Sequence, residues 1–242
     1  IMSISQEILD RYRANRMTPF AKGVSTLVTL EDYESLSLEG VLVYLIDFVE
    51  RYKTNEKAEK IREDANVPYP CAALSDVDFG VQPNISDLEV NTLVSKTWTR
   101  IGDHQVIAGF NGNEKLKFAS AIANEFVDKA TSTFALSLNK LLIDLRMSFS
   151  KKQTDTKLKE LNNVDVLLIH DWLLKDKSIE DVSLLSLFLK ARKQPLLIVT
   201  NMPTERWRDD VQQSKLPEAM QKQLLNKTHF WRFKEPSEST MH

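Results

Sequence analysis

The C-terminal two thirds of the chain alternate between short, unbroken apolar runs and longer segments with helical spacing. The apolar runs predict strands at 105–108, 133–136, 164–169, 195–200 and 228–233. Segments with helical spacing predict helices between them, at 118–127, 138–149 and 180–191. Unbroken apolar runs are typical of strands buried on both faces, and alternation with helices indicates parallel pairing. We therefore expect an α/β fold whose parallel sheet is covered by helices.

The first third of the chain shows helical spacing alone. A modest amphipathic helix is predicted over 5–17, with Ser5 as its cap, and Thr18-Pro19 is expected to end it. A longer helix is predicted from its cap Ser37 to Arg62, and its apolar stripe comprises Leu42, Leu45, Ile46 and Val49. The strongly charged second part of this helix is either a solvated face or a surface for a partner or the DNA backbone.

A change of pattern separates the two regions. Pro68-Tyr69-Pro70 ends the helical region. Residues 66–80 cluster Asn, Pro and Asp without helical period, which predicts that this range is a linker. We place the domain boundary near residue 75, giving a small all-α N-terminal domain with its linker over 1–75 and an α/β domain over 76–242. A further helix is predicted at about 84–98.

Composition narrows the classes of function. The chain has 32 basic and 34 acidic residues and a net charge of −2, so DNA binding would require a local basic patch. The one cysteine, Cys71, excludes an internal disulfide or a cysteine-built zinc site and fits a reducing cytosol. The four histidines lack metal-ligand spacing, so no metal site is predicted. Without an apolar run of about 18 residues or a signal pattern, we expect a cytoplasmic protein with no membrane contact.

A phosphate-loop candidate follows the first predicted strand and opens a helix. Such a loop has the pattern Gly-x4-Gly-Lys-Ser/Thr, in which backbone N–H groups and the lysine hold phosphates and the hydroxyl holds magnesium. Here Gly109, Gly112 and Lys115 match, and Asn111 lies within the loop; Glu114 replaces the second glycine of the pattern and Leu116 replaces the hydroxyl residue. Taken alone, the segment could equally be an ordinary strand–turn–helix connection with a solvated lysine.

Five further segments carry a family resemblance. Asp165-Val166-Leu167-Leu168-Ile169-His170-Asp171 looks like a Walker B strand, and 197–207 resembles a strand followed by Thr-Ser-Asn-Leu-Pro and a nearby Trp. The segments 39–62 and 74–79 are similar to the helical part of IstB proteins, and 161–165 looks like DnaC-type helicase loaders. The chain thus resembles the IstB/DnaC group of AAA+ P-loop proteins over roughly residues 5–233. This implies an AAA+ domain behind a helical domain that docks partners.

The chain departs from the family pattern at positions that the family uses for ATP hydrolysis. By the resemblance, Asp171 is the acid that would polarise the attacking water and Asn201 is the sensor of the γ-phosphate. His170 stands where the family has its magnesium-supporting acid, and Gln223 stands where it has an arginine finger. Since phosphoryl transfer relies on magnesium and on cationic charge at the γ-phosphate, we expect no normal ATP hydrolysis. No cofactor is required, and ATP or ADP would bind weakly.

The resemblance implies an accessory protein in DNA transactions, of the IstB type that assists a transposase. The alternatives are a DnaC-like loader or regulator of a replicative helicase, a residual ATPase switch, and a pure protein-interaction module; a homo-oligomer is compatible with each. Candidate DNA-backbone contacts are Lys115, Lys117, Lys151, Lys152, Arg206 and Arg208. Ordinary surface charge is the alternative for each of these cations.

Overall fold

The computed structural model describes residues 4–77, 86–95, 97–110 and 113–233. Contacts divide the chain into two compact units, Ile1–Lys60 and Ile61–His242. This division falls earlier than the boundary near residue 75 that the sequence suggests. None of the described helices is both long enough and apolar enough to cross a membrane.

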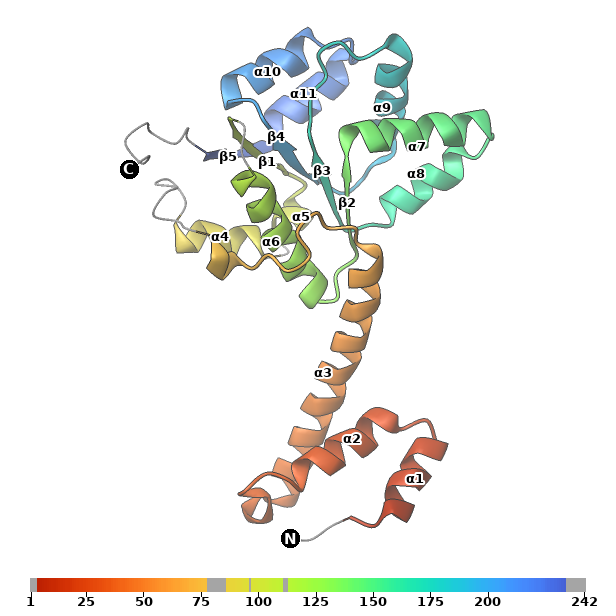
Figure 1. Ribbon diagram of the computed structural model, residues 1–242, viewed down its shortest axis with the longest axis vertical. Helices are drawn as coiled ribbons and strands as arrows, with labels where there is room; N and C mark the ends of the chain where they lie inside the picture. The colour runs from red at the N-terminus through yellow and green to blue at the C-terminus, as the bar shows by residue number, and fades with distance from the viewer. Residues whose placement is uncertain (1–3, 78–85, 96, 111–112, 234–242) are drawn as a thin grey trace. The chain divides into compact units, whose positions relative to one another are not determined.

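The N-terminal unit is helical, as predicted. It contains α1 (Gln6–Ala14), α2 (Thr18–Leu27) and most of α3 (Leu38–Asp64), shown in red and orange in Figure 1. α1 ends at Ala14, before the predicted break at Thr18-Pro19, which instead begins α2, a helix that the sequence interpretation missed. Proline is well tolerated in a first helical turn, where its missing N–H has no intrahelical partner.

The core of this unit uses only one side of α3. The buried residues are Leu9, Ala21, Val24 and Leu45, with Val41 and Tyr44 of α3 packed against them. The predicted cap is present, since Ser37 Oγ accepts the Gly40 N–H at 3.1 Å. Of the four residues of the predicted apolar stripe, Leu45 is buried, Val49 is half-buried, and Leu42 and Ile46 are exposed.

The second unit contains a five-stranded sheet, and each pair of neighbouring strands is parallel. The strand order is β2-β3-β4-β1-β5. The strands are β1 (His104–Gly109), β2 (Thr133–Ser137), β3 (Val166–His170), β4 (Leu196–Thr200) and β5 (Thr228–Phe233). All five predicted strands are therefore present, and the predicted parallel sheet is confirmed.

Helices cover both faces of the sheet (Figure 1). They are α4 (Asp87–Leu93), α5 (Thr97–Ile101), α6 (Glu114–Asp128), α7 (Leu138–Ser150), α8 (Thr154–Asn162), α9 (Ile179–Ala191), α10 (Thr204–Gln213) and α11 (Glu218–Asn226). The predictions for α6, α7 and α9 are confirmed. The single helix predicted over 84–98 is instead the pair α4 and α5. The helices α8, α10 and α11 were not predicted, because each has only nine or ten residues and most of these are polar.

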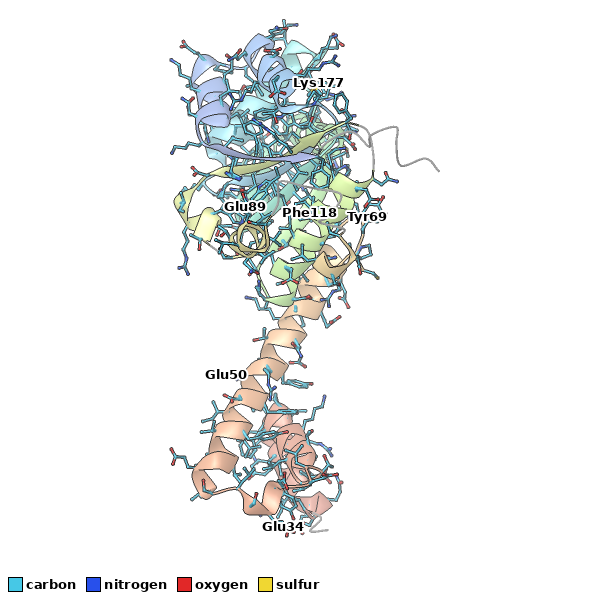
Figure 2. The ribbon with its side chains drawn as sticks, turned by 90° about the vertical axis from the view of Figure 1, so that its left-hand side faces the viewer. Glu34, Glu50, Tyr69, Glu89, Phe118 and Lys177 are labelled. Carbon is cyan, nitrogen blue, oxygen red and sulfur yellow. The ribbon has the colours of Figure 1, made fainter. Side chains whose placement is uncertain are left out.

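Alternate residues of each central strand enter opposite cores. In β1, Val106 and Ala108 pack with α7, α9 and α10, whereas Ile107 packs with α4, α5 and α6. Phe118 of α6, labelled in Figure 2, is fully buried in the second of these cores. Full burial of such a side chain contributes about 1.5–3 kcal/mol, so the two cores together hold the sheet between its helical layers.

Residues 61–77 pack on the α/β unit and do not form a free linker. The Ala135 N–H of the edge strand β2 donates to Ala65 O at 2.8 Å, and Asn66 Nδ2 donates to Ala135 O at 2.9 Å. Asn124 of α6 donates to two carbonyls of the same segment at 3.0 and 2.8 Å. The segment thereby covers part of the free edge of β2, where unpaired backbone groups would otherwise be available to another strand.

Arg192 ties the starts of β3 and β4 to the preceding loops. Its buried guanidinium donates to four backbone carbonyls, those of Leu161, Val164, Asp165 and Pro195, at 2.6 to 3.4 Å. Burial lowers the pKa of Arg192 to about 10, so it remains charged at neutral pH. These contacts fix the edge of the sheet opposite to the predicted phosphate loop.

His104 predicts a pH dependence of stability. Its buried Nδ1 accepts the Leu196 N–H at 3.0 Å, and burial lowers the pKa of His104 to about 4. The unfolded chain, with an ordinary histidine pKa near 6.5, takes up this proton first, so stability is lost as pH falls from about 6.5 to 4. We expect the free energy of unfolding to be about 2 kcal/mol lower at pH 5 than at pH 8 from this group.

His104→Asn keeps an acceptor for Leu196 and should remove most of this loss, as measured by urea unfolding at both pH values. His229→Asn, at an exposed position of β5, is the matched control and should retain the wild-type pH dependence. Equal pH dependence in both variants would contradict the assignment to His104.

Candidate functional site

Three of the predicted site segments lie at one edge of the sheet. β3, β4 and β1 are adjacent and parallel, so their carboxyl ends bring together His170-Asp171, Asn201 and Gly109. In open α/β sheets this edge is where ligands bind. The arrangement provides the frame for a phosphate site, with the loop after β1 next to the end of β4.

Backbone contacts hold these loop starts in place. The Gly109 N–H donates to Met202 O at 3.0 Å, and the Trp172 N–H donates to Val199 O at 3.1 Å. Thr200, buried at the end of β4, donates through Oγ1 to Trp172 O at 3.0 Å. The loops after β1 and β3 are therefore both anchored to β4 or to the loop that follows it.

Gly109 has a steric role that does not depend on any ligand. A Cβ at this position would lie 2.4 Å from the carbonyl oxygen of Phe233 and 2.9 Å from its Cβ. Glycine therefore permits the close approach of β1 and β5. Asn111 and Gly112, the other predicted loop residues, lie outside the described residues.

Lys115 is the buried cation of the site. It lies in the first turn of α6 with 2% of its surface exposed, and its Nζ donates to the carbonyl oxygen of Phe110 in the preceding loop. Burial lowers the pKa of Lys115. A buried ammonium is costly unless charge or hydrogen bonds compensate it, so an anion at this helix start would be favoured. The solvated lysine considered as the alternative is not what the structure shows.

Glu114 is compensated by a neighbouring cation. Its carboxylate lies 2.9 Å from Lys117 Nζ at the surface, and this pair raises the pKa of Lys117. Both side chains line a cavity of about 360 Å³ together with residues of the segment 68–77. The pairing offsets part of the negative charge that Glu114 brings to the loop, and it also engages Lys117, one of the predicted DNA contacts.

The positions that would support magnesium hold other groups. Leu116 is half-buried and packs against the core beneath α6, so its position supplies no oxygen ligand. His170 Nδ1 lies 2.8 Å from a carboxylate oxygen of Asp171, whose backbone is left-handed with φ of 54°. Within the described ranges, no group of three or more His, Cys, Asp or Glu residues could hold a metal ion. These two positions thus offer a leucine and an imidazole in place of the hydroxyl and the carboxylate that would hold magnesium.

Asp210 is a structural part of this edge that the sequence interpretation missed. From α10 its carboxylate accepts the N–H groups of Leu174 and Lys175, at 2.8 and 2.7 Å, in the loop after β3. Burial raises the pKa of Asp210. No sequence signal marks it, because α10 was not predicted and both partners are backbone groups.

The predicted γ-phosphate sensor and the position of the arginine finger lie toward opposite edges of the sheet. Asn201 is exposed directly after β4, on the same edge as Lys115, and its side chain forms no hydrogen bond with another described residue. Gln223 lies in α11, which leads into the start of β5 and therefore toward the opposite edge of the sheet.

The remaining predicted DNA contacts do not form one patch with Lys117. Lys151 and Lys152 are exposed in the turn between α7 and α8, which lies away from the sheet in Figure 1. Arg206 and Arg208 are on α10, where the guanidinium of Arg208 lies 5.1 Å from the ring centre of Phe230. The cations therefore occupy three separate places in the fold.

Comparison with known proteins identifies relatives in insertion sequences. A protein named for ATP binding from insertion sequence IS1162 of Pseudomonas fluorescens is 27% identical over 169 residues, covering 70% of this chain and 73% of that protein. A similarly named protein from insertion sequence IS232 of Bacillus thuringiensis subsp. berliner is 23% identical over 155 residues. That match spans 63% of this chain and 62% of the relative.

Solved structures with the same fold include the DnaC helicase loader, DnaI and DnaA. The DnaC helicase loader has a TM-score of 0.53 at 17% identity, covering 61% of this chain and 87% of that chain. DnaI has a TM-score of 0.51 at 19% identity, covering 69% and 89%. AMPPCP-bound DnaA from Aquifex aeolicus has a TM-score of 0.52 at 14% identity, covering 68% and 50%. At these identities the likeness establishes the fold, which confirms the predicted AAA+-type P-loop domain.

The family model described as "IstB-like ATP binding protein" matches residues 12–240, nearly the whole chain. With the fold, the Lys115 loop and the insertion-sequence relatives in agreement, the chain belongs to the IstB-like ATP-binding protein family.

Proposed function

We propose that this chain is an accessory protein of insertion-sequence transposition that binds nucleotide phosphate weakly and turns over ATP slowly or not at all. It would act by contacting DNA, by recruiting a transposase, or by both. Membership in the IstB-like family and the names of the insertion-sequence relatives support the setting. The likeness to helicase loaders rests on fold alone, so a loader role has less support.

The main support for nucleotide binding is the buried Lys115 at the start of α6. Its ammonium has a carbonyl as its hydrogen-bond partner, and α6 presents its N-terminal end to the same loop. A phosphate there would gain from the cation and from the free N–H groups of the first helical turn. ATP would supply such a phosphate, held by Lys115 and backbone.

The same geometry argues against efficient hydrolysis. Leu116 packs into the core and carries no oxygen, and His170, in contact with Asp171, places an imidazole where magnesium would need a carboxylate. Stabilising the transferring phosphoryl group depends on that ion and on further positive charge. The chain retains residues that bind phosphate but lacks those that would support the reaction.

We predict that nucleotide binding depends on Lys115. With ATP or ADP in EDTA at ten times the dissociation constant, the wild type should gain about 1.4 kcal/mol of stability, seen as a higher melting temperature. Lys115→Met should lose this gain, because the phosphate loses its buried cation. Lys190→Met, which removes an exposed cation of α9 on the other face of the sheet, should retain it. A ligand-induced shift that survives in Lys115→Met would contradict the proposed phosphate site.

Replacing the two aberrant residues should create a dependence on magnesium. The wild-type affinity for ATP, measured by calorimetry, should be equal in magnesium and in EDTA. Leu116→Thr combined with His170→Asp supplies a hydroxyl and a carboxylate, and magnesium should then strengthen binding about ten-fold or more. Leu116→Val with His170→Asn, matched in size but without the hydroxyl and the charge, should stay independent of magnesium. Brisk magnesium-dependent phosphate release by the wild type would refute the proposal.

DNA binding should be electrostatic and dispersed over several sites. We expect affinity for duplex DNA to fall steeply with salt, since each phosphate contact contributes about 0.9 to the logarithmic slope. The double variants Lys151→Gln/Lys152→Gln and Arg206→Gln/Arg208→Gln should each reduce that slope by up to about 2. An exposed pair outside the predicted set, Lys190→Gln/Lys193→Gln, should leave it unchanged. Absence of DNA binding at low salt would reject the DNA part and leave partner recruitment alone.

A further inference from the structure

α3 displays an apolar stripe that the N-terminal core does not use. Leu38, Leu42 and Ile46 are 77%, 50% and 58% exposed, and their spacing of four residues places them along one side of the helix. We call these three residues the α3 stripe. Apolar residues exposed in a contiguous row on a soluble unit typically mark an interaction surface.

Acidic residues accompany the α3 stripe. Helical spacing places Glu39 and Glu50 directly beside it on the side away from the core, with Asp47 further around the helix. All three are exposed, and none forms an ion pair with another described residue; Figure 2 labels Glu50 on this helix. The surface is therefore an apolar row bordered by negative charge.

The α/β unit carries an apolar groove between α9 and α11. Its volume is about 640 Å³, and we call it the α9–α11 groove. It is lined by Ile179, Val182, Ser183, Ser186, Leu187, Lys190, Lys215, Pro217, Ala219 and Met220. Ile179 and Leu187 remain 69% and 46% exposed, so the groove offers apolar surface that the described chain leaves open.

The charges of the groove are opposite to those beside the α3 stripe. Lys190 and Lys215 are the charged residues among its described lining, and neither forms an ion pair with another described residue. Glu218, next to the lining in α11, is already paired with Lys222 at 2.6 Å. An apolar ligand bordered by carboxylates would match both the groove and its two free cations.

The groove is long enough to take the stripe. The α9 residues that line it run from Ile179 to Lys190, which is about 16 Å of helix. The stripe from Leu38 to Ile46 spans about 12 Å. We propose that the α3 stripe of one copy docks in the α9–α11 groove of a second copy.

Such a contact joins two different surfaces and is heterologous. Each copy keeps one unused stripe and one unused groove, so assembly continues head to tail until it closes into a ring or grows as a filament. A single helix docked in a groove of this size buries less surface than a standard stable interface does. Association should therefore be weak and concentration-dependent. The contact uses no nucleotide and no DNA, and it stands independently of the proposed function.

Complementation between blocked variants tests this arrangement. Leu42→Asp/Ile46→Asp blocks the stripe and Leu187→Asp blocks the groove, each at exposed positions. In sedimentation without nucleotide or DNA, the wild type should grow in mean mass with concentration, whereas each variant alone should stay monomeric. An equimolar mixture of the two should form a complex of two chains and no larger, because one intact stripe and one intact groove remain.

Phe149→Asp, at an apolar α7 position that is 60% exposed, is the matched control and should associate like the wild type. Melting temperatures near the wild-type value establish that the variants are folded. A wild type that stays monomeric over the whole concentration series, or blocked variants that fail to complement, would overturn the proposal.

Charge reversal provides a second measurement on the same contact. Glu39→Lys/Glu50→Lys and Lys190→Glu/Lys215→Glu should each weaken association about ten-fold, and higher salt should weaken that of the wild type. A chain carrying all four substitutions should recover association, since the pairing of opposite charges is restored. If either charge reversal leaves the strength of association unchanged, that result would contradict docking of the α3 stripe in the α9–α11 groove.

Discussion

Burial of β1, β3 and β4 on both faces is the constraint on which the rest of the structure depends. Successive residues of these strands enter two different cores, so the central residues of each strand are apolar and each face is covered by helices. Parallel pairing of the same strands then brings their carboxyl ends to one edge. The phosphate-loop lysine, the end of the Walker B-like strand and the sensor-like asparagine share that edge for this reason.

At that edge the chain has a buried lysine at the P-loop position and other groups where the family pattern places metal ligands. Lys115 is buried although burial disfavours its charge, and an anion beside it would offset that cost. Leu116 contributes to the core where the family has a hydroxyl, and His170 pairs with Asp171. The residues at these positions are thus integrated into packing and hydrogen bonding.

The surfaces outside this edge differ in chemical character. Both units of this chain expose apolar surface bordered by charge, and the sign of that charge is opposite in the two units. The separation of cations into three places, in contrast, gives no single basic face. Association with other protein chains therefore has a clearer structural basis here than the reading of DNA does.

The sequence by itself determined the five strands, the helices α1, α3, α6, α7 and α9, and the family. These follow from local periodicity and from the motif order around Lys115, Asp171 and Asn201. It did not determine the residues near them in space: the Glu114–Lys117 pair, the Asp210 contacts to the loop after β3, or the packing of Leu116. Nor could the sequence show that, among the four apolar residues predicted to line one side of α3, Leu45 is buried while Leu42 and Ile46 are exposed. Periodicity reports that a residue is apolar, but which side of a helix is covered depends on contacts between segments far apart in the chain, and only the tertiary structure sets those.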